Sequence, residues 1–391
     1  MIRRRFGRTE LQMPVITMGG MRFQKSWSDD KPEDIEKVQQ DNVNAIVEKA
    51  LSLDVNHIET ARGYGSSEFQ LGKCIVDIPR EKFILQSKVA PNADPEVFKT
   101  NFYKSMELLQ VDHLDLLGLH GINNDEILDN ALNKCMPLVR EFQKQGLVRH
   151  VGFSTHGSAE VINRAIDSDE FDYINLHYYY IDQSNASCIE NATKHDMGIF
   201  IISPNDKGGR LYDPPKKLSD MVAPYSPMEF NNMFCLKDKR IHTLSMGVSN
   251  PTDFDHHVES LRLLTEDMTE HTNIVDSLNR ELQEVFPLDL KNEIIKHCLN
   301  YEKIPNQVNI FVITRLWSLA KAFDLVGYGK MRYNLIGNGG HWFPGVQYEE
   351  AFKKDIEATL KNLKYKTEIL DILDECVDLF KGEEQKRLSE S

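Results

Sequence analysis

The chain has 391 residues, of which 41% are hydrophobic and 27% charged, which is enough for one large domain with a sizeable core and a smaller second domain. Its formal net charge of −14 repels phosphate backbones and anionic bilayers, so neither nucleic acid nor a membrane is an expected partner. The six cysteines form no C-x-x-C pair, the start MIRRRFGRTE has no apolar signal core, and no stretch approaches the roughly 20 apolar residues of a membrane helix. Composition therefore predicts a cytoplasmic protein with reduced thiols.

Short apolar runs alternate with longer amphipathic runs over most of the chain. The strand-like runs lie at residues 15–20, 55–60, 82–88, 114–120, 150–154, 173–179, 198–203 and 242–247. They are short and apolar on both faces, as buried parallel strands are. Eight such strands alternating with helices over roughly 250 residues predict a (β/α)8 barrel. An open doubly wound sheet is the alternative, but it would carry a GxGxxG turn after the first strand, where the chain reads MGGMRF.

The pattern changes beyond about residue 285, where helical periods continue without strands between them. We therefore expect a barrel domain at residues 1–285 and an all-helical domain at residues 286–391, ending in a frayed tail. Two long segments, 21–40 and 212–240, follow the first and seventh strands. Insertions there lie on the functional face of a barrel, so both are expected to wall a substrate pocket. Surface loops without structure are the alternative.

Four polar side chains stand at or just beyond the ends of the second, third and fourth strands: Glu59, Tyr64, Lys88 and His120. The carboxyl ends of neighbouring parallel strands meet at one rim of a barrel, so these side chains are expected to converge. Each has an ordinary alternative, such as a packed rim tyrosine, a solvated lysine, a structural histidine or a turn-capping carboxylate. Their joint placement favours a catalytic group.

Reduction of a carbonyl is the chemistry that suits this group. Hydride addition leaves negative charge on the carbonyl oxygen, which must then be protonated. The pKa of free tyrosine is about 10, and an ammonium beside Tyr64 is expected to lower it. Glu59 would hold Lys88 in place and offset the cost of burying its charge. His120 would orient the carbonyl oxygen with a hydrogen bond.

Residues 1 to about 270 resemble the aldo-keto reductase family. RRRFGRTELQMPVITMGG is similar to its N-terminal hairpin and first strand, and ETARGYGSSEFQLG is similar to its DTAxxYGxSExxLG signature. SKV and GLHG fall where the family has its lysine and histidine, and HVGFST, INLHYYYID and IFIISPNDKGG resemble its later cofactor strands. The resemblance implies a barrel that binds NADPH without a Rossmann domain and reduces a small aldehyde or ketone.

The resemblance also assigns roles to individual residues. It implies that Tyr64 is the general acid, that Lys88 is its pKa partner and that His120 orients the carbonyl. It further implies a set of cofactor-binding positions: Gly20, Met21, Ser154, Thr155, Asn175, Ser203, Gly247, Ser249 and His257. Among these, Ser154 would bind the nicotinamide carboxamide, Ser203 would lie near the pyrophosphate, and Gly247 and Ser249 would contact the adenosine phosphate.

Several positions depart from the family pattern. Glu59 replaces an aspartate, Thr155 an asparagine and Asn175 a glutamine, while His256–His257 replace a Glu-Asn pair. No Lys or Arg lies between residues 247 and 261, so the preference for NADPH over NADH follows from the resemblance alone. The His pair is expected on a helix surface and not at a metal site. The segment DKGGRL (206–211) suits a phosphate-binding loop or a tight turn, and both readings remain open.

The C-terminal segment has a second resemblance, to a helical ferredoxin-like domain that follows the barrel in one branch of the family and carries two C-x2-C-x2-C-x3-C-P runs. IPNQVNIFVITRLWSLAKAF and IGNGGHWFP are similar to parts of it. The corresponding ligand positions hold no cysteine; they are Ile294, His297, Asn300, Ile304, Tyr333, Ile336, Gly339 and Phe343. We therefore expect no iron–sulfur cluster, and a helical domain that covers the pocket or docks a protein partner.

A function of another class stays open. Replaced cofactor positions and missing cluster ligands also fit a nucleotide-binding regulatory or scaffold protein with little or no turnover. The presence of Tyr64, Lys88 and His120 favours the enzyme, because a scaffold has no physical need for all three.

Overall fold

The computed structural model describes residues 1–24, 26–29, 31–264, 267–338 and 340–382. The chain divides into two compact units. Met1–Gly208 and Met228–Thr265 belong to the first, and Gly209–Pro227 and Glu266–Lys386 belong to the second. The predicted boundary after residue 285 falls inside the second unit, which also contains helix α11 (Thr269–Val285). The division of the chain into independent domains stays a prediction.

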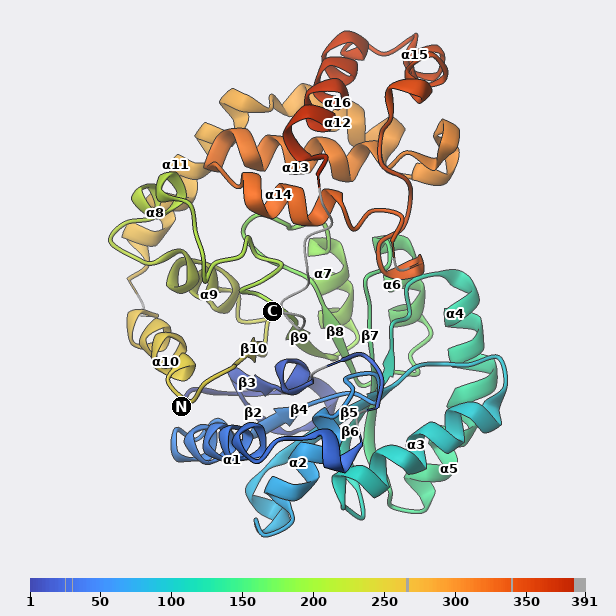
Figure 1. Ribbon diagram of the computed structural model, residues 1–391, viewed down its shortest axis with the longest axis vertical. Helices are drawn as coiled ribbons and strands as arrows, with labels where there is room; N and C mark the ends of the chain where they lie inside the picture. The colour runs from blue at the N-terminus through green and yellow to red at the C-terminus, as the bar shows by residue number, and fades with distance from the viewer. Residues whose placement is uncertain (25, 30, 265–266, 339, 383–391) are drawn as a thin grey trace. The chain divides into compact units, whose positions relative to one another are not determined.

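Eight parallel strands of the first unit close into a barrel in the order β10-β3-β4-β5-β6-β7-β8-β9 (Figure 1). The strands are β3 (Ile16–Gly19), β4 (His57–Glu59), β5 (Ile84–Val89), β6 (Leu114–His120), β7 (Val148–Ser154), β8 (Tyr173–Leu176), β9 (Gly198–Ile201) and β10 (Thr243–Gly247). Each strand overlaps one of the eight apolar runs. The predicted (β/α)8 fold is therefore confirmed, and the doubly wound alternative is wrong.

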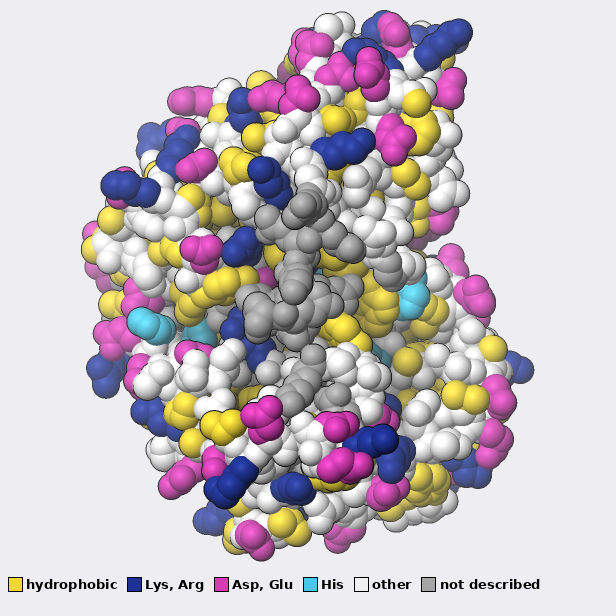
Figure 2. Space-filling view, viewed as in Figure 1, with side chains coloured by type: hydrophobic (Ala, Val, Ile, Leu, Met, Phe, Trp, Pro, Cys, Tyr) yellow, Lys and Arg dark blue, Asp and Glu magenta, His cyan; other side chains and the backbone are white. Residues whose placement is uncertain are grey.

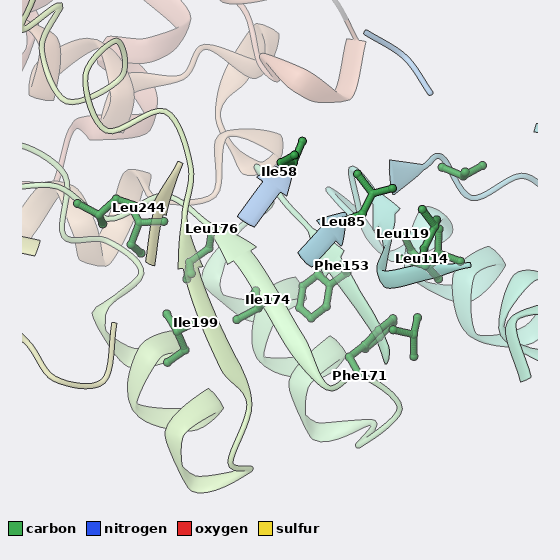
Figure 3. Close-up of a cluster of buried hydrophobic side chains, with 14 of the residues drawn as sticks. Ile58, Leu85, Leu114, Leu119, Phe153, Phe171, Ile174, Leu176, Ile199 and Leu244 are labelled. Atoms are coloured by element: carbon green, nitrogen blue, oxygen red, sulfur yellow. The ribbon is translucent and has the colours of Figure 1, made fainter. Parts of the chain in front are cut away.

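Helices alternate with these strands and surround the barrel (Figure 1). They are α1 (Lys37–Ser52), α2 (Ser67–Ile75), α3 (Pro95–Leu109), α4 (Asp125–Asn130), α5 (Met136–Lys144), α6 (Ala159–Asp167), α7 (Ala186–Lys194), α9 (Pro227–Lys237) and α10 (Asp253–Leu263). Side chains that leave the strands outward fill the layer beneath the helices, among them Ile58, Leu85, Phe153, Ile174 and Leu244 (Figure 3). Since side chains alternate along a strand, the neighbours of Ile58, which are His57 and Glu59, face the barrel interior.

A hairpin of β1 (Arg3–Arg5) and β2 (Gln12–Pro14) precedes the barrel. Phe6, between these strands, is fully buried and packs on Gly198 at the start of β9, where a Cβ atom would come within 2.7 Å of its ring. Because Gly198 opens its strand, the hairpin lies at the amino end of the barrel. The carboxyl ends of the strands are thus at the other end, where barrel enzymes carry their sites.

The second unit is helical. It contains α8 (Lys216–Met221), α11, α12 (Leu288–Cys298), α13 (Ile310–Phe323), α14 (Val326–Tyr333), α15 (Lys353–Leu360) and α16 (Lys366–Phe380). Phe380 of α16 packs against Gly329 of α14, where a Cβ atom would come within 2.4 Å of the Phe380 ring. The expected all-helical region is therefore confirmed. Of the sequence expectations, the cluster-ligand position Gly339 and all but the first two residues of the frayed tail (381–391) lie outside the described residues.

Residues 212–240 are not the loop that the sequence predicts, because they contain both α8 and α9. This segment holds four prolines, which favour irregular structure. Phe230, Met233 and Leu236 are nevertheless buried at helical spacing, and their packing stabilises α9.

The described part of the chain has no helix of the length and hydropathy that a bilayer crossing needs. All six cysteines are free thiols, and five of them are buried. On the face shown in Figure 2, Lys and Arg side chains are interspersed with Asp and Glu side chains.

Candidate active site

A buried ion pair lies at the carboxyl end of the barrel. Glu59 ends β4 and Lys88 lies one residue before the end of β5, and their alternation along the strands turns both side chains inward. Nζ of Lys88 donates hydrogen bonds to Oε1 of Glu59 and, over 2.7 Å, to the carbonyl oxygen of Thr60. Oγ of Ser245 donates to the second oxygen of Glu59 over 3.2 Å. Glu59 thus forms with Lys88 the pair that the sequence analysis expects.

Tyr64 lies beside this pair. Its ring centroid is 4.8 Å from Nζ of Lys88 and 5.7 Å from the ring centroid of His120, which meets it edge-on at 85°. Gly65 has a φ of +48°, and a Cβ atom there would lie 2.2 Å from the carbonyl oxygen of Ser26. Only glycine fits this close turn, which packs the Tyr64 loop against the segment that follows β3. The structure thus brings together all four predicted catalytic residues.

Burial shifts the pKa values of both Tyr64 and Lys88, and the shift of Tyr64 is opposite to the one that the sequence predicts. Burial raises the pKa of the Tyr64 phenol above its usual value, where the sequence predicts a lowered pKa. Burial also lowers the pKa of the Lys88 ammonium well below its usual range, while the Glu59 carboxylate opposes that shift. In the free protein, desolvation of the phenolate thus sets the direction in which the pKa of Tyr64 is shifted.

A second buried carboxylate fixes the Tyr64 loop, and the sequence analysis missed it. Glu68 of α2 is fully buried, accepts a hydrogen bond of 2.6 Å from Oγ of Ser87 and pairs with the guanidinium of Arg62. Arg62 also pairs with Asp29, and its backbone N–H donates to the carbonyl oxygen of Lys88 over 2.8 Å. The E of the SExxLG motif is the sequence signal that points to this contact.

Three of the predicted cofactor-binding residues follow His120 across the sheet. Ser154 pairs in register with His120 on one side and with Asn175 on the other. Both side-chain polar atoms of Asn175 are buried without a hydrogen-bond partner, so its amide can bond a carboxamide at this position. Oγ of Ser154 accepts from the backbone N–H of Gly121 over 3.1 Å. The hydroxyl of Thr155 donates to the carbonyl oxygen of Ile122 over 2.7 Å, which uses its only proton.

The predicted adenosine-phosphate residues lie beside an arginine that sequence reasoning missed. Nη1 of Arg22 donates a hydrogen bond of 3.0 Å to Oγ of Ser249, and Nε of Arg22 lies 3.1 Å from the point where a Cβ of Gly247 would be. Asp253 accepts from the backbone N–H of Ser249 over 2.7 Å. Sequence reasoning missed Arg22 because residue 22 comes close to residue 249 only when the first strand closes on the eighth.

The remaining cofactor positions have different surroundings. Gly20 is buried with its carbonyl oxygen bonded to Oγ of Ser67 over 2.8 Å, and Met21 next to it is partly exposed. Ser203 follows β9 with a φ of +53°. His257 is only 2% exposed, and its ring nitrogens lie 3.3 Å and 3.4 Å from the side-chain amides of Asn205 and Asn232. His257 is therefore part of buried packing and not on the helix surface where the sequence placed it.

No group of three or more His, Cys, Asp or Glu side chains with the geometry of a metal site occurs among the described residues.

The profile of the Aldo/keto reductase family matches residues 15–230, which is more than half of the chain. The chain therefore belongs to the aldo/keto reductase family, a family of oxidoreductases. It is 28% identical over 126 residues to L-galactose dehydrogenase of Arabidopsis thaliana and 25% identical over 215 residues to D-threo-aldose 1-dehydrogenase of a Pseudomonas species. The matches cover 30% and 45% of this chain, and they span 39% and 64% of those relatives.

Solved structures share the barrel. The holo form of aldo-keto reductase AKR11C1 from Bacillus halodurans superposes with a TM-score of 0.60 at 19% identity, covering 70% of this chain and 95% of that one. An aldo-keto reductase from Klebsiella pneumoniae in complex with NADPH superposes with a TM-score of 0.58 at 18% identity. The match covers 71% of this chain and 95% of that one. These likenesses show the fold.

Proposed function

We propose that the protein is an NADPH-dependent oxidoreductase that reduces an aldehyde or ketone to an alcohol, with Tyr64 as the proton donor. The observation that carries the proposal is the buried pair of Glu59 and Lys88 next to Tyr64 and His120. Burying an ammonium and a carboxylate costs free energy that a merely structural rim would not need. Such costly groups concentrate where chemistry requires them.

The residues along the next strands suit a dinucleotide. The unpartnered amide of Asn175 fits a carboxamide, and the guanidinium of Arg22 beside Ser249 fits a phosphate. A reduced nicotinamide held there supplies a hydride. Family membership and the NADPH complex of the Klebsiella structure support this cofactor for the present chain.

In the proposed mechanism, each residue at the rim has one task. His120 donates a hydrogen bond to the substrate oxygen and orients the carbonyl. The Tyr64 hydroxyl gives its proton to the same oxygen as negative charge develops there. The ammonium of Lys88 stabilises the phenolate that remains, and Glu59 keeps that ammonium charged and in place.

We also infer a cytoplasmic location, supported by the six free thiols, and a small carbonyl substrate. A protein partner for the helical C-terminal region stays a proposal.

The test combines binding and turnover. Fluorescence titration with NADPH and oxidation of NADPH in the presence of 4-nitrobenzaldehyde are measured for the wild type, Tyr64→Phe and Tyr103→Phe. Tyr103 is 43% exposed on α3 and serves as the matched control. We expect Tyr64→Phe to bind NADPH as the wild type does and to lose most of its turnover, while Tyr103→Phe keeps both.

The other outcomes are equally decisive. Binding without turnover in the wild type would favour the regulatory or scaffold protein, and absence of binding would reject both readings. Unchanged turnover in Tyr64→Phe would reject Tyr64 as the acid.

A further inference from the structure

A buried serine reaches the ion pair of Glu59 and Lys88 from the strand that closes the barrel. Ser245 lies on β10 and Glu59 on β4, and β3 runs between these two strands. Oγ of Ser245 donates a hydrogen bond of 3.2 Å to Oε2 of Glu59, while Oε1 of Glu59 accepts from Nζ of Lys88. Ser245 is 7% exposed and Glu59 is 3% exposed, so this bond forms away from bulk water. Each oxygen of the carboxylate therefore has a donor of its own.

The bond can cross β3 because Gly19 has no side chain. Gly19 pairs in register with Gly247 of β10 and with Glu59 of β4. A Cβ atom on Gly19 would lie 2.6 Å from Oγ of Ser245 and 3.4 Å from Oε2 of Glu59, so it would occupy the path of the hydrogen bond. The φ of Gly19 is −89°, which any residue adopts. The glycine is therefore needed here for the space it leaves and not for its backbone freedom.

One layer lower in the barrel, the same three strands are joined in a different way. Oγ1 of Thr17 on β3 lies 2.8 Å from Oγ1 of Thr243 on β10 and 2.7 Å from Nδ1 of His57 on β4. In that layer the middle strand supplies a hydroxyl that bridges its two neighbours. At the level of Glu59 the middle strand has no side chain, and β10 reaches β4 directly. This arrangement directs the hydroxyl of Ser245 to the carboxylate that holds Lys88.

The hydroxyl of Ser245 affects the charge of the ion pair. A buried carboxylate keeps its negative charge only when donors replace the water that it has lost. Lys88 and Ser245 are such donors to Glu59. Without Ser245, Glu59 would bind a proton more readily and would stabilise the ammonium of Lys88 less. Tyr64, whose ring centroid lies 4.8 Å from Nζ of Lys88, would then lose part of the stabilisation of its phenolate.

Other titratable and charged groups lie around the pair on several elements. They are His57 one layer below on β4, Tyr64 and His120 at the rim, and Arg22 beside Gly247. All of them are kept when Ser245 or Gly19 is replaced. A shift in the pH dependence of such a variant therefore reports the contact between Ser245 and Glu59.

We propose that Ser245 is a positioning residue for the reduction, which keeps the carboxylate of Glu59 charged and directed at Lys88. Through this pair, Ser245 stabilises the phenolate that Tyr64 becomes when it has given up its proton. The inference rests on the proposed function and extends its mechanism by one residue. Ser245 acts through Glu59 and not on the substrate oxygen.

The test uses the full chain and six proteins: the wild type, Ser245→Ala, Ser245→Thr, Gly19→Ala, the double variant Gly19→Ala/Ser245→Ala, and Thr243→Val. Thr243→Val removes a buried hydroxyl from the same strand one layer lower and is the matched control. The dissociation constant of NADPH is measured by fluorescence, and kcat and KM are measured with 4-nitrobenzaldehyde.

The reverse reaction supplies a readout that a merely structural role would not change. When NADP+ oxidises 4-nitrobenzyl alcohol, a hydride passes from the alcohol carbon to the nicotinamide, and the hydroxyl proton passes to the phenolate of Tyr64. The rate therefore rises as pH increases through the pKa of Tyr64. The pH dependence of kcat/KM in this direction measures how well the phenolate is stabilised.

Ser245→Ala should lower kcat of the reduction by about fivefold or more, as loss of a hydrogen bond to a charged group does, and should change the NADPH constant by less than about twofold. Its oxidation rate should rise at a pH about half a unit higher or more. Gly19→Ala should behave in the same way, and the double variant should lose no more than either single variant, because both break one bond. Ser245→Thr keeps the hydroxyl and most of kcat, and Thr243→Val keeps the kcat and the pH dependence of the wild type.

A Ser245→Ala protein with the kcat and the pH dependence of the wild type overturns the inference and leaves the proposed function intact. So do equal losses in Ser245→Ala and Thr243→Val, because the effect would then belong to any buried hydroxyl of β10. A change confined to the NADPH constant also overturns it, as does a loss in the double variant that equals the product of the two single losses. A wild type that neither binds NADPH nor reduces the aldehyde overturns the proposed function and the inference together.

Discussion

Arg22 donates a hydrogen bond of 3.0 Å to the hydroxyl of Ser249 across the seam where β3 pairs with β10. The guanidinium passes over Gly247, whose missing side chain leaves it room. Asn42 of α1 donates to the carbonyl oxygen of Ser249 over 2.7 Å, which holds this loop in place from a second element. A cation is therefore fixed at the position that the family resemblance gives to the adenosine phosphate.

Replacing Arg22 is predicted to change the preference between the two nicotinamide dinucleotides. Arg22→Gln removes the charge that a 2′-phosphate would meet, so the dissociation constant of NADPH should rise by about tenfold. The constant of NADH, which lacks that phosphate, should change less than about twofold. Fluorescence titration of the same protein with each cofactor gives the ratio of the two dissociation constants directly.

The matched control for this prediction is Arg262→Gln, since Arg262 is 75% exposed on α10.

Asp253 supplies a test that should change NADPH binding in the opposite direction, because its negative charge lies beside Ser249. Its carboxylate accepts hydrogen bonds from the backbone N–H of Ser249 and of Asn250. Asp253→Asn removes a nearby negative charge and should tighten NADPH binding relative to NADH. Equal changes for both cofactors in Arg22→Gln would show that Arg22 only shapes the loop.

The contacts of Arg22 show which parts of the site the sequence could predict. The eight strands were predictable because each is a short run that is apolar on both faces. Tyr64, Lys88 and His120 were predictable because their positions at strand ends are local features. The Arg22–Ser249 contact joins residues 227 positions apart, so it depends on barrel closure, which no local pattern encodes.

Other features were beyond sequence reasoning for physical reasons. The pKa of Tyr64 depends on desolvation against a neighbouring charge, and only packing decides which of the two is larger. Helix α9 was missed because the four prolines of residues 212–240 suggested a loop, while the buried side chains of the helix stabilise it. His257 was placed on a surface because the sequence does not show the two asparagines that enclose it.

Breaking the buried ion pair is predicted to destabilise the fold. Glu59→Gln leaves the ammonium of Lys88 buried without a carboxylate, so the free energy of unfolding should fall by about 3 kcal/mol. Urea denaturation at pH 7 measures the change. The double variant Glu59→Gln/Lys88→Met removes the stranded charge and should recover part of the loss.

Asp41→Asn is the comparison for an exposed pair, because Asp41 bonds Lys37 on the surface of α1 and should cost at most about 1 kcal/mol. Similar losses for Glu59→Gln and Asp41→Asn would contradict the buried character of the Glu59–Lys88 pair.

The pH dependence of the reduction should reflect the raised pKa of Tyr64. A proton donor acts in its protonated form, so the rate is lost as pH rises through its pKa in the folded protein. Because burial raises that pKa above the usual value, kcat/KM for 4-nitrobenzaldehyde should stay constant from pH 7 to about 9. A decline with an apparent pKa below about 9 would instead mean that Lys88 stabilises the phenolate more than burial disfavours it.

Stability at mildly acidic pH should depend on His57 inside the barrel. The ring is fully buried, its Nδ1 lies 2.7 Å from the hydroxyl of Thr17, and burial lowers its pKa to about 3. In the unfolded chain the same ring has a pKa of about 6.5, so below that pH only the unfolded state takes up the proton. Folding is therefore penalised by up to about 1.4 kcal/mol for each pH unit below 6.5.

Because of this penalty, the free energy of unfolding should fall measurably as the pH is lowered from 6.5 to 5. This interval lies above the range in which ordinary carboxylates titrate. His57→Asn keeps a polar atom near the position of Nδ1 and cannot be protonated, so its free energy of unfolding should fall less steeply over that interval than that of the wild type. His256→Asn, at an exposed position on α10, controls for the loss of a histidine. Parallel slopes for the wild type and His57→Asn would mean that His57 binds a proton in the folded barrel, in spite of its burial beside Thr17.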